Sequence, residues 1–230
     1  MPANRDIRVE AVTEAVEAKA SDSEAAVIDE HVRRPLIGLT PEQLSEVAVS
    51  VGLPRFAGKQ MARWLYVGRA TSVDEMTDLS KQGRIRLAQA GYVVGREEPL
   101  ASTASRDGTV KYLFRGCGGR DVESVYIPEK DGRATLCVSS QAGCKMHCAF
   151  CMTGRQGFHG NLTTAQIINQ ILSIPQSRDL TNVVFMGMGE PTDNLDAVLD
   201  TIEILTAPWG LAWSPKRITV SPVGNIPGLR

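Results

Sequence analysis

The stretch ATLCVSSQAGCKMHCAFC, residues 134–151, joins a short apolar segment to a loop with three cysteines. The segment Ala134–Ser139 has the apolar and β-branched composition of a buried strand. Cys144, Cys148 and Cys151 follow it with the spacing C-x3-C-x2-C. In folds built from parallel strands, the loops at the carboxyl ends of the strands carry the chemistry. This stretch therefore predicts a strand that leads into a ligand-bearing or catalytic loop.

Downstream of the cysteines the pattern alternates between helix and strand. Helical periodicity and short apolar runs predict, in order, a helix over Thr163–Ile174, a strand over Val183–Met188, a helix over Leu195–Leu205 and a strand over Arg217–Ser221. Such alternation is typical of parallel βα units. Together with the strand before the cysteines, it predicts three βα units in succession.

Upstream of the cysteines the sequence predicts a β-hairpin. Two β-rich segments, Thr109–Arg115 and Asp121–Ile127, flank the run Gly116-Cys117-Gly118-Gly119. Glycine-rich runs between two such segments are typical of hairpin turns.

Before the hairpin, helix signals dominate. Thr40 is a predicted N-cap, with Pro41 at the first helical position and Gln43 at the capping-box position, and this helix can end at Gly52. A second helix is expected over Ala57–Gly68. A third is expected after Ser80, so the sequence predicts a small helical domain here.

The three clustered cysteines are better explained by ligation than by disulfides. Three thiolates in so short a loop can hold three corners of one cubic iron–sulfur cluster, which leaves the fourth iron open. A zinc site completed by His147 or His159 is the alternative, although zinc ligands usually come as two spaced pairs. Absorbance of the anaerobically purified protein separates the two, because zinc is colourless.

Composition sets the wider limits. The chain has 230 residues, 43% of them hydrophobic, and a net charge of −1, which is ordinary for a globular protein. No apolar run approaches the roughly 20 residues of a membrane-spanning helix, and the start lacks a signal-peptide core. We therefore expect a cytoplasmic protein without a membrane segment.

Charge is distributed unevenly along the chain. Residues 1–30 hold three basic and eight acidic side chains, whereas residues 31–70 hold six basic and two acidic ones. We expect an acidic, disordered tail over residues 1–38, a small helical domain over 39–95, and the hairpin with the βα units over 96–230. The basic side chains of the helical domain are open to two interpretations, a solvated face or contact with an RNA backbone.

These motifs carry a resemblance to a known family. The C-x3-C-x2-C spacing is the signature of radical S-adenosylmethionine (SAM) enzymes. The residues around it, together with FAGKQMARWLY (56–66), DEMTDLS (74–80) and TNVVFMGMGEP (181–191), resemble the RlmN/Cfr family of RNA methyltransferases. The resemblance covers about residues 40–230. It implies an α/β fold, a partial radical-SAM (βα) barrel made of the first three βα units, preceded by a small helical N-terminal domain and a β-hairpin.

The resemblance also implies two cofactors and residues that hold them. Cys144, Cys148 and Cys151 would bind a [4Fe–4S] cluster whose open iron chelates SAM. Gly189 and Glu190 would contact the amino group of SAM. Alone, this GMGEP segment would be interpreted as a turn with a solvated glutamate.

Ser221 matches a serine of the family that contacts SAM. The family usually continues Ser-Thr-x-Gly, whereas this chain has Pro222 after the serine. Proline removes an amide donor and restricts the residue before it, so this position departs from the pattern of the family. A serine that only caps its own strand end is the alternative.

Two further residues match catalytic positions. Cys137 corresponds to a cysteine that helps to resolve the reaction intermediate and pairs transiently with a second, methyl-carrying cysteine. Glu123 corresponds to a carboxylate that accepts a proton. On pattern alone, a strand cysteine is a small buried hydrophobe and a strand glutamate faces solvent. Cys117 matches no role in the family.

The function that the resemblance implies is methyl transfer to C2 of adenosine in 23S rRNA and tRNA, through a methyl-cysteine intermediate. A C8-methylating, Cfr-like enzyme and a truncated, non-catalytic remnant that binds the cluster or RNA are the alternatives. The expected partners are the RNAs and an electron donor such as flavodoxin, and we expect a monomer. The family's methyl-carrying cysteine lies near its C-terminus. All five cysteines here precede residue 152, so we expect the chain to lack that part.

Overall fold

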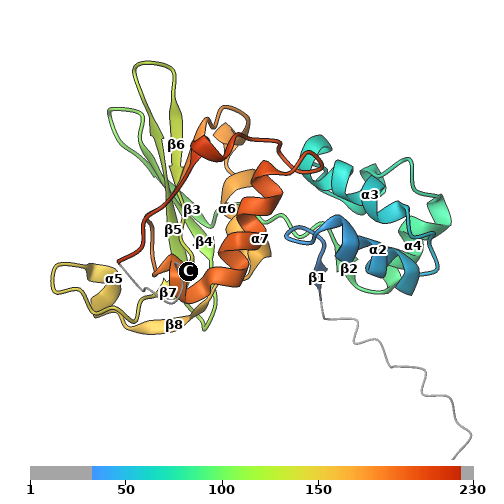
Figure 1. Ribbon diagram of the computed structural model, residues 1–230, viewed down its shortest axis with the longest axis horizontal. Coiled ribbons are helices and arrows are strands. Elements are labelled where there is room, and N and C mark those ends of the chain that lie inside the picture. Colours follow the sequence, from blue (N-terminus) through green and yellow to red (C-terminus); the bar gives the residue numbers. More distant parts are fainter. Residues whose placement is uncertain (1–32, 224–230) are drawn as a thin grey trace, which may run out of the picture. The chain divides into compact units, whose positions relative to one another are not determined.

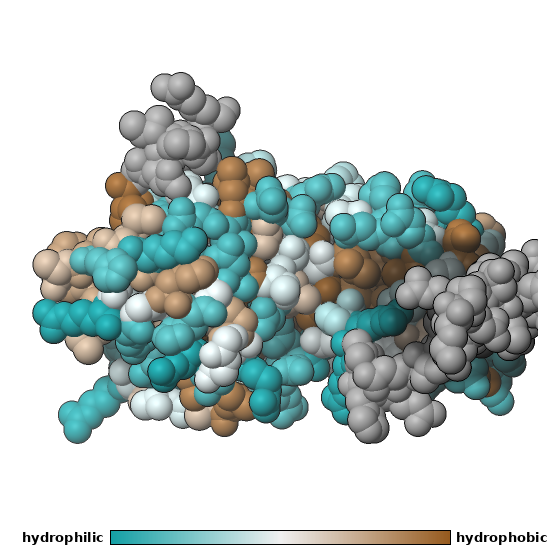
Figure 2. Space-filling model, turned by 90° about the horizontal axis from the view of Figure 1, so that it is seen from below, coloured by the Kyte–Doolittle hydropathy of each residue, from teal (hydrophilic) through white to brown (hydrophobic). Residues whose placement is uncertain are grey.

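A computed structural model describes residues 33–223. Figure 1 shows its helices and strands, whose labels are used below. The expected acidic tail lies outside the described residues up to position 32. Within the described part, no helix is long and apolar enough to cross a membrane. On the face seen in Figure 2, hydrophilic residues predominate and apolar residues form smaller patches.

The expected helical domain is present as a set of short helices, called the helical module below. These are α2 (Pro41–Ser50), α3 (Ala57–Ala62), the π-helix η1 (Arg63–Gly68), the 3-10 turn η2 (Val73–Glu75) and α4 (Lys81–Gln89). Thr40 caps α2 as predicted, because its hydroxyl accepts from the amide of Gln43 while the Gln43 side chain accepts from the amide of Thr40. Ser80 caps α4.

The second predicted helix differs in detail from the structure. It covers the expected residues, but only its first half is α-helical, and Arg69 ends it in a left-handed conformation with φ 57°. Helices α2 and α3 pack with their backbones close together, since a Cβ on Gly58 would lie 2.4 Å from the amide nitrogen of Ser45. Fully buried Leu44 and Met61 form part of the core between them.

Two short parallel strands, which the sequence did not predict, flank the helices of the helical module in sequence and pair with each other. β1 (Arg34–Pro35) pairs with β2 (Tyr92–Val93). Leu36 and Ile37 follow β1 and are completely buried. The expected domain boundary at residue 39 therefore falls inside the described fold, and the division of the chain into domains stays a prediction.

The central sheet has six strands in the described part, in the order β10-β9-β6-β5-β4-β3. The parallel strands are β6 (Ala134–Cys137), β9 (Asn182–Phe185) and β10 (Ile218–Val220). The antiparallel part contains β3 (Ala101–Ala104), β4 (Val110–Arg115) and β5 (Asp121–Pro128). The hairpin and the three parallel strands are therefore where the sequence predicted them. β3 was not predicted, because its sequence ASTA is exposed and has no apolar alternation.

The two faces of this sheet have different surroundings. Helices α6 (Thr164–Leu172) and α7 (Leu195–Thr206) lie over one of them, called the covered face (Figure 1). Strand register assigns alternate residues to each face. The covered face carries large buried side chains: Tyr112, Phe114, Val122, Leu136, Val183 and Phe185. The opposite face, called the open face, carries residues that are only partly buried: Glu123, Val125, Cys137 and Val184.

Helix α6 contacts the sheet on one side and the helical module on the other. Ile167, Ile168 and Ile171 belong to the core under the covered face. On the other side, a Cβ on Gly38 would lie 2.5 Å from the amide nitrogen of Ala165. The Arg96 guanidinium donates to the carbonyl of Leu172, the last residue of α6. One helix therefore supports two parts of the fold.

The cysteine loop (residues 144–157) lies between two strands that the sequence did not predict. β7 (Gln141–Gly143) pairs antiparallel with β8 (Phe158–Asn161), and the short helix α5 (Met152–Arg155) lies between them. Short 3-10 turns complete the connections: η3 (Pro175–Arg178), η4 (Pro191–Asn194) and η5 (Pro215–Arg217).

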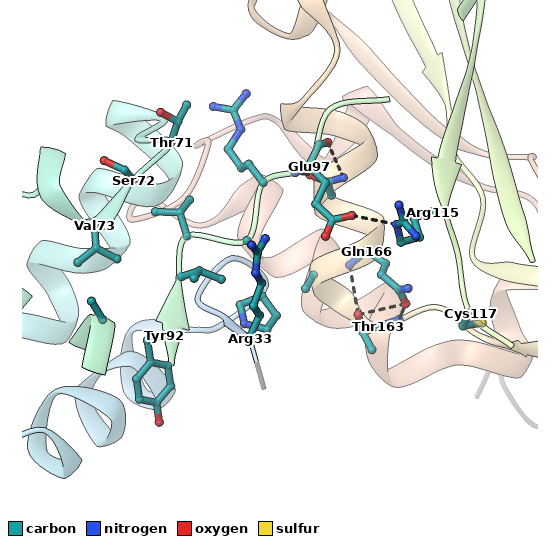
Figure 3. Close-up of a pocket in the computed structure, with 18 of the residues that line it drawn as sticks. Arg33, Thr71, Ser72, Val73, Tyr92, Glu97, Arg115, Cys117, Thr163 and Gln166 are labelled. Carbon is teal, nitrogen blue, oxygen red and sulfur yellow. Dashed lines mark hydrogen bonds and ion pairs between the residues drawn. The ribbon is translucent and has the colours of Figure 1, made fainter. Parts of the chain in front are cut away.

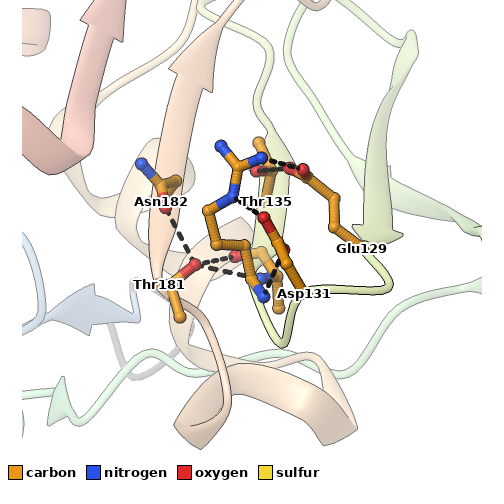
Figure 4. Close-up of polar contacts among 7 residues, drawn as sticks. Glu129, Asp131, Thr135, Thr181 and Asn182 are labelled. Atoms are coloured by element: carbon orange, nitrogen blue, oxygen red, sulfur yellow. Dashed lines mark hydrogen bonds and ion pairs between the residues drawn. The ribbon is translucent and has the colours of Figure 1, made fainter.

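Polar contacts hold the start of β6, which is the end farther along the chain from the cysteine loop (Figure 4). Arg133 pairs with Asp131 at 2.8 Å and also with Glu129, both in the turn between β5 and β6. The hydroxyl of Thr181 accepts from the amide of Ala134 at 2.9 Å, which ties the start of β6 to the start of β9. These charges are therefore engaged in the turn and lie away from the cysteines.

Candidate functional site

Segments that the sequence marks as functional meet at one edge of the sheet. Residues 138–143, which lead into the cysteine loop, the GMGE segment (residues 187–190) and Ser221 each follow the carboxyl end of a parallel strand. Backbone hydrogen bonds join the first two: the amide of Gly187 donates to the carbonyl of Val138 at 3.1 Å, and the amide of Gln141 donates to that of Met188 at 3.1 Å. The structure therefore brings together the predicted ligand loop and the predicted SAM-binding segment.

The three cysteines lie in one short loop with different exposure. Cys144 is 9% exposed, whereas Cys148 and Cys151 are partly exposed. Among the described residues, no three His, Cys, Asp or Glu side chains are placed to share a single metal ion. A cubic cluster presents a separate iron to each thiolate, so its ligands need not converge on one ion. Three soft sulfur donors in one loop fit such a cluster.

The surroundings of two of these thiols differ. The backbone amide of Gly154, at the start of α5, lowers the pKa of Cys151 by hydrogen bonding. Burial raises the pKa of Cys144. Cys151 is therefore more readily deprotonated than Cys144. This matters for ligation, because the thiolate is the form that binds a metal.

The two histidines of the zinc alternative are not grouped with the cysteines. One ring nitrogen of His147 lies 2.5 Å from the carbonyl oxygen of Lys145, and one of His159 lies 3.0 Å from that of Gln156. Neither imidazole joins a group of ligands among residues 33–223.

Glu190 is a buried residue, so the interpretation of it as a solvated turn glutamate is wrong. Its side chain is at the start of η4, and the residue is 2% exposed. Its carboxylate accepts from the amide and hydroxyl of Thr192, at 3.0 and 2.6 Å, and from the amide of Val223 at 2.9 Å. In the part of the chain that the structure describes, no basic side chain forms an ion pair with it. A buried carboxylate held by neutral donors is suited to receive a cation.

The backbone conformation at position 189 requires a glycine. Its φ is +99°, and a Cβ there would lie 2.5 Å from the Cβ of Gln141. Any other residue would be strained and would push the GMGE segment away from β7. Glycine at position 189 therefore lets this segment lie close to Gln141.

A set of buried polar side chains at this edge was missed from the sequence. The hydroxyl of Ser139 donates to the carbonyl of Glu123 at 2.6 Å and accepts from the amide of Met188 at 2.9 Å. The Asn194 amide donates to the carbonyls of Ser140 and Leu162. The run SSQ before the cysteines was the available signal, because a polar run that follows a buried strand must find hydrogen-bond partners.

Glu123 and Cys137 lie on the open face of the sheet. Val125 is opposite Cys137 in the register, and Glu123 is two residues from Val125, so all three share that face. The Glu123 carboxylate pairs with Lys111 at 2.9 Å and remains 44% exposed. Burial raises the pKa of Cys137. The face that carries both predicted catalytic residues is the one that α6 and α7 leave uncovered.

The side chain of Ser221 is not held in place by other described residues. The residue is exposed, it follows β10, and its side chain makes no hydrogen bond to residues 33–223. The amide two residues later, that of Val223, is the one that reaches Glu190. Whether Ser221 contacts SAM stays a prediction.

A cavity of about 840 Å³ lies beside α6 (Figure 3), and none of its lining residues belongs to the cysteine loop. Arg115 and Glu97 face each other across part of it at 3.9 Å, and Thr163 and Gln166 at the start of α6 hydrogen-bond to each other. Cys117 also lines this cavity, so it is not part of the cysteine cluster.

Comparisons with known families agree with both halves of the fold. Residues 35–93 match the ribosomal RNA large subunit methyltransferase N-terminal domain. Residues 138–227 match the radical SAM superfamily.

Individual relatives extend this agreement. A probable dual-specificity RNA methyltransferase RlmN of Parabacteroides distasonis is 56% identical over 198 residues, which are 86% of this chain and 57% of the relative. A protein of the same name from Porphyromonas gingivalis strain W83 is 58% identical, over 82% of this chain and 55% of the relative. The chain thus spans about half the length of the curated relatives it matches.

A solved structure is also similar. The crystal structure of a radical SAM methyltransferase from Sphaerobacter thermophilus has a TM-score of 0.75 and 37% identity, over 84% of this chain and 58% of that one. The sheet order, the cysteine loop at its carboxyl edge and the two matched domain models lead to one assignment. The chain belongs to the RlmN/Cfr family within the radical SAM superfamily.

Proposed function

We propose that the protein containing these residues methylates C2 of adenosine in 23S rRNA and tRNA through a methyl-cysteine intermediate. The observation that carries this proposal is that the residues leading into the cysteine loop are hydrogen-bonded to the GMGE segment at the carboxyl edge of the parallel strands. The names of the relatives support the RNA substrates. Membership in the radical SAM superfamily implies a [4Fe–4S] cluster and SAM as cofactors.

The donor set of the cysteine loop fits this cluster. Cys144, Cys148 and Cys151 would each hold one iron, which leaves one iron free for SAM. When bound, the two cofactors supply the radical chemistry that an adenine carbon requires, because that carbon is not nucleophilic. The chain's own residues then have to hold the cofactors, orient the base and manage protons.

Glu190 is the residue proposed to hold the SAM ammonium. Its carboxylate is buried, and its hydrogen bonds come from neutral donors. A charge-assisted bond to an ammonium would offset the cost of this burial. Gly189 would keep the neighbouring backbone close to the same group. Ser221 is the least supported of the proposed SAM contacts, because its side chain is exposed.

Glu123 and Cys137 are proposed to work on the adenine. They share the open face, where an unstacked base has access to both. Glu123 would accept the proton that the ring loses, with Lys111 orienting its carboxylate at 2.9 Å. The Cys137 thiol would first lose its proton, and the thiolate would then attack the sulfur of a second cysteine. A disulfide forms as the bond between that sulfur and the product carbon breaks, and that carbon keeps the electron pair and takes up a proton.

The helical module is proposed to hold the RNA through phosphate contacts. The segment of residues 31–70 carries four more basic than acidic side chains, and several of them, such as Arg55 and Lys59, are exposed. A flavodoxin-type electron donor, a monomeric state and a cytoplasmic location complete the proposal.

Mass spectrometry of nucleosides tests the function directly. Digested 23S rRNA and tRNA from cells with an intact gene should contain 2-methyladenosine, and RNA from cells in which the gene is disrupted should lack it at the affected position. Appearance of 8-methyladenosine instead would indicate a Cfr-like enzyme. Identical nucleosides in both strains would contradict RNA methylation and favour a non-catalytic role.

A further inference from the structure

We propose that Gln141 is a positioning residue that sets the place of the Glu190 backbone, and thereby the affinity for SAM. The inference rests on the proposed function, because it assumes that Glu190 contacts SAM. It adds a residue outside the predicted ligand and catalytic sets. Gln141 precedes Cys144 by three residues and begins β7, the strand that leads into the cysteine loop.

Gln141 contacts three consecutive residues of the GMGE segment. Its backbone amide donates to the Met188 carbonyl at 3.1 Å. Its Cβ lies so close to Gly189 that a side chain there could not fit. Its side-chain Oε1 accepts from the amide of Glu190 at 2.9 Å. One residue therefore fixes the path of the backbone that leads into the Glu190 carboxylate.

The other end of the Gln141 amide is held as well. Its Nε2 donates to Oδ1 of Asn161 at 2.8 Å, and Nδ2 of Asn161 donates to the carbonyl of Asp193 at 3.2 Å. Asn161 is on β8, and Asp193 is in η4, the turn that Glu190 begins. The Gln141 side chain is completely buried, so both of its polar atoms require these partners. The amide thus joins both strands of the β7–β8 ribbon to the GMGE segment.

This bridge requires the chemistry of a glutamine. It needs an acceptor for the Glu190 amide and a donor for Asn161, on a side chain long enough to reach both. A methionine has a similar length and can fill the space, but its sulfur is only a weak acceptor and it has no donor. Replacement by methionine would leave the Glu190 amide without a strong buried partner and would free that backbone to move.

The fold contains a matched control. Gln170 is also completely buried, and its side chain likewise uses both an acceptor and a donor. Its Oε1 accepts from the amide of Ser139 at 2.9 Å, and its Nε2 donates to the carbonyls of Ser139 and Gln166 at 3.0 and 3.3 Å. Gln170 lies on α6 and makes no direct hydrogen bond to the GMGE segment. Its partner Ser139 bonds the Met188 amide through its hydroxyl, and a methionine at position 170 leaves that hydroxyl in place. A methionine at either position removes the same chemistry, but only one of the two changes touches Glu190.

The experiment compares Gln141→Met and Gln170→Met in the whole chain, reconstituted anaerobically with iron and sulfide. Iron per chain, thermal unfolding and the Kd for SAM by calorimetry are measured for each. We expect Gln141→Met to bind SAM about tenfold more weakly with unchanged iron content, as the loss of one buried hydrogen bond implies. We expect Gln170→Met to lower the melting temperature while it keeps the SAM affinity within about twofold.

A third variant covers the case in which Gln141→Met fails to fold. Asn161 is exposed, so Asn161→Ala should be tolerated, and it removes the bonds of Asn161 to the Gln141 side chain and to the Asp193 carbonyl. We expect it to weaken SAM binding about threefold without loss of iron. Unchanged SAM affinity in Asn161→Ala, or equal weakening in both methionine variants, would overturn the inference. A wild-type chain that binds iron but no SAM would instead contradict the proposed function.

Discussion

The covered and open faces of the central sheet carry different kinds of residues. The covered face presents fully buried Leu136 and Val183 to α6 and α7. The open face presents the half-buried Cys137, which is next to Leu136 on β6, and Glu123 on the neighbouring strand β5. Alternation along a strand makes this division possible, because neighbouring residues point to opposite sides. The comparison teaches that the fold is stabilised on one face, while reactive groups are displayed on the other face and at the carboxyl edge.

The largest expected effect is loss of the iron–sulfur cluster, which should follow changes in the cysteine loop but not changes elsewhere in the sheet. Replacing Cys148 by Ala should abolish the brown absorbance of the reconstituted chain, because the cluster then has too few thiolates in this loop. Cys137→Ala on the open face and Cys117→Ala beside the cavity should both keep it. A full cluster in Cys148→Ala would show that the ligands have been assigned wrongly.

The second prediction tests which face stabilises the fold. Leu136→Ala should reduce the free energy of unfolding by roughly 2–5 kcal/mol, because it leaves a cavity in a completely buried site. Val184→Ala on the open face should cost about 1 kcal/mol, since less of that side chain leaves water on folding. Urea unfolding followed by circular dichroism measures both. Equal losses would mean that the open face is packed as well as the covered one.

A smaller effect is expected from the buried carboxylate at the edge. Glu190→Gln should weaken SAM binding by about 1.5–3 kcal/mol, because a charge-assisted bond to the ammonium is replaced by a neutral one. Iron content should not change. The exposed Glu98 provides a control, and Glu98→Gln should bind SAM like the original chain. The assignment of Glu190 would be wrong if calorimetry gave one affinity for all three proteins.

The smallest effect concerns protonation on the open face. Burial raises the pKa of Cys137, so its thiolate should appear at higher pH in the folded chain than in the unfolded one. Alkylation of Cys137 by iodoacetamide, followed by peptide mass spectrometry, should reach its half-maximal rate at higher pH without urea than with it. The neutral thiol's contribution to stability is present below the ordinary thiol pKa and disappears as pH rises through the folded one. Coincident pH profiles would contradict this.

Local chemistry allowed much of the fold to be predicted. The Thr40 capping box, the glycine-rich hairpin turn and the alternation of helix and strand after residue 134 are all present, because each depends on residues close in sequence. The β7–β8 ribbon was missed because its pairing depends on a return of the chain after the cysteine loop. β1 was missed for a similar reason, since its partner lies more than fifty residues later.

The candidate site was predictable in its residue types but not in its environment. The cysteine spacing and the GMGE segment are visible in the sequence. The burial of Glu190 and its bond from Val223 depend on segments that only the folded sheet brings together. The run SSQ signals that Ser139 and Gln141 need hydrogen-bond partners, but it does not tell which groups those partners are, because they come from segments distant in sequence.

The position of α6 has a consequence for how the chain folds. This helix is packed between the sheet and the helical module, where Gly38 meets Ala165 backbone to backbone and Arg96 bonds the last carbonyl of the helix. If α6 opens, both neighbours lose buried surface at once. The two regions should therefore melt in a single cooperative transition, and the slowest-exchanging amides of both should report the same opening free energy. Helix α6 therefore joins the sheet and the helical module into one cooperative unfolding unit.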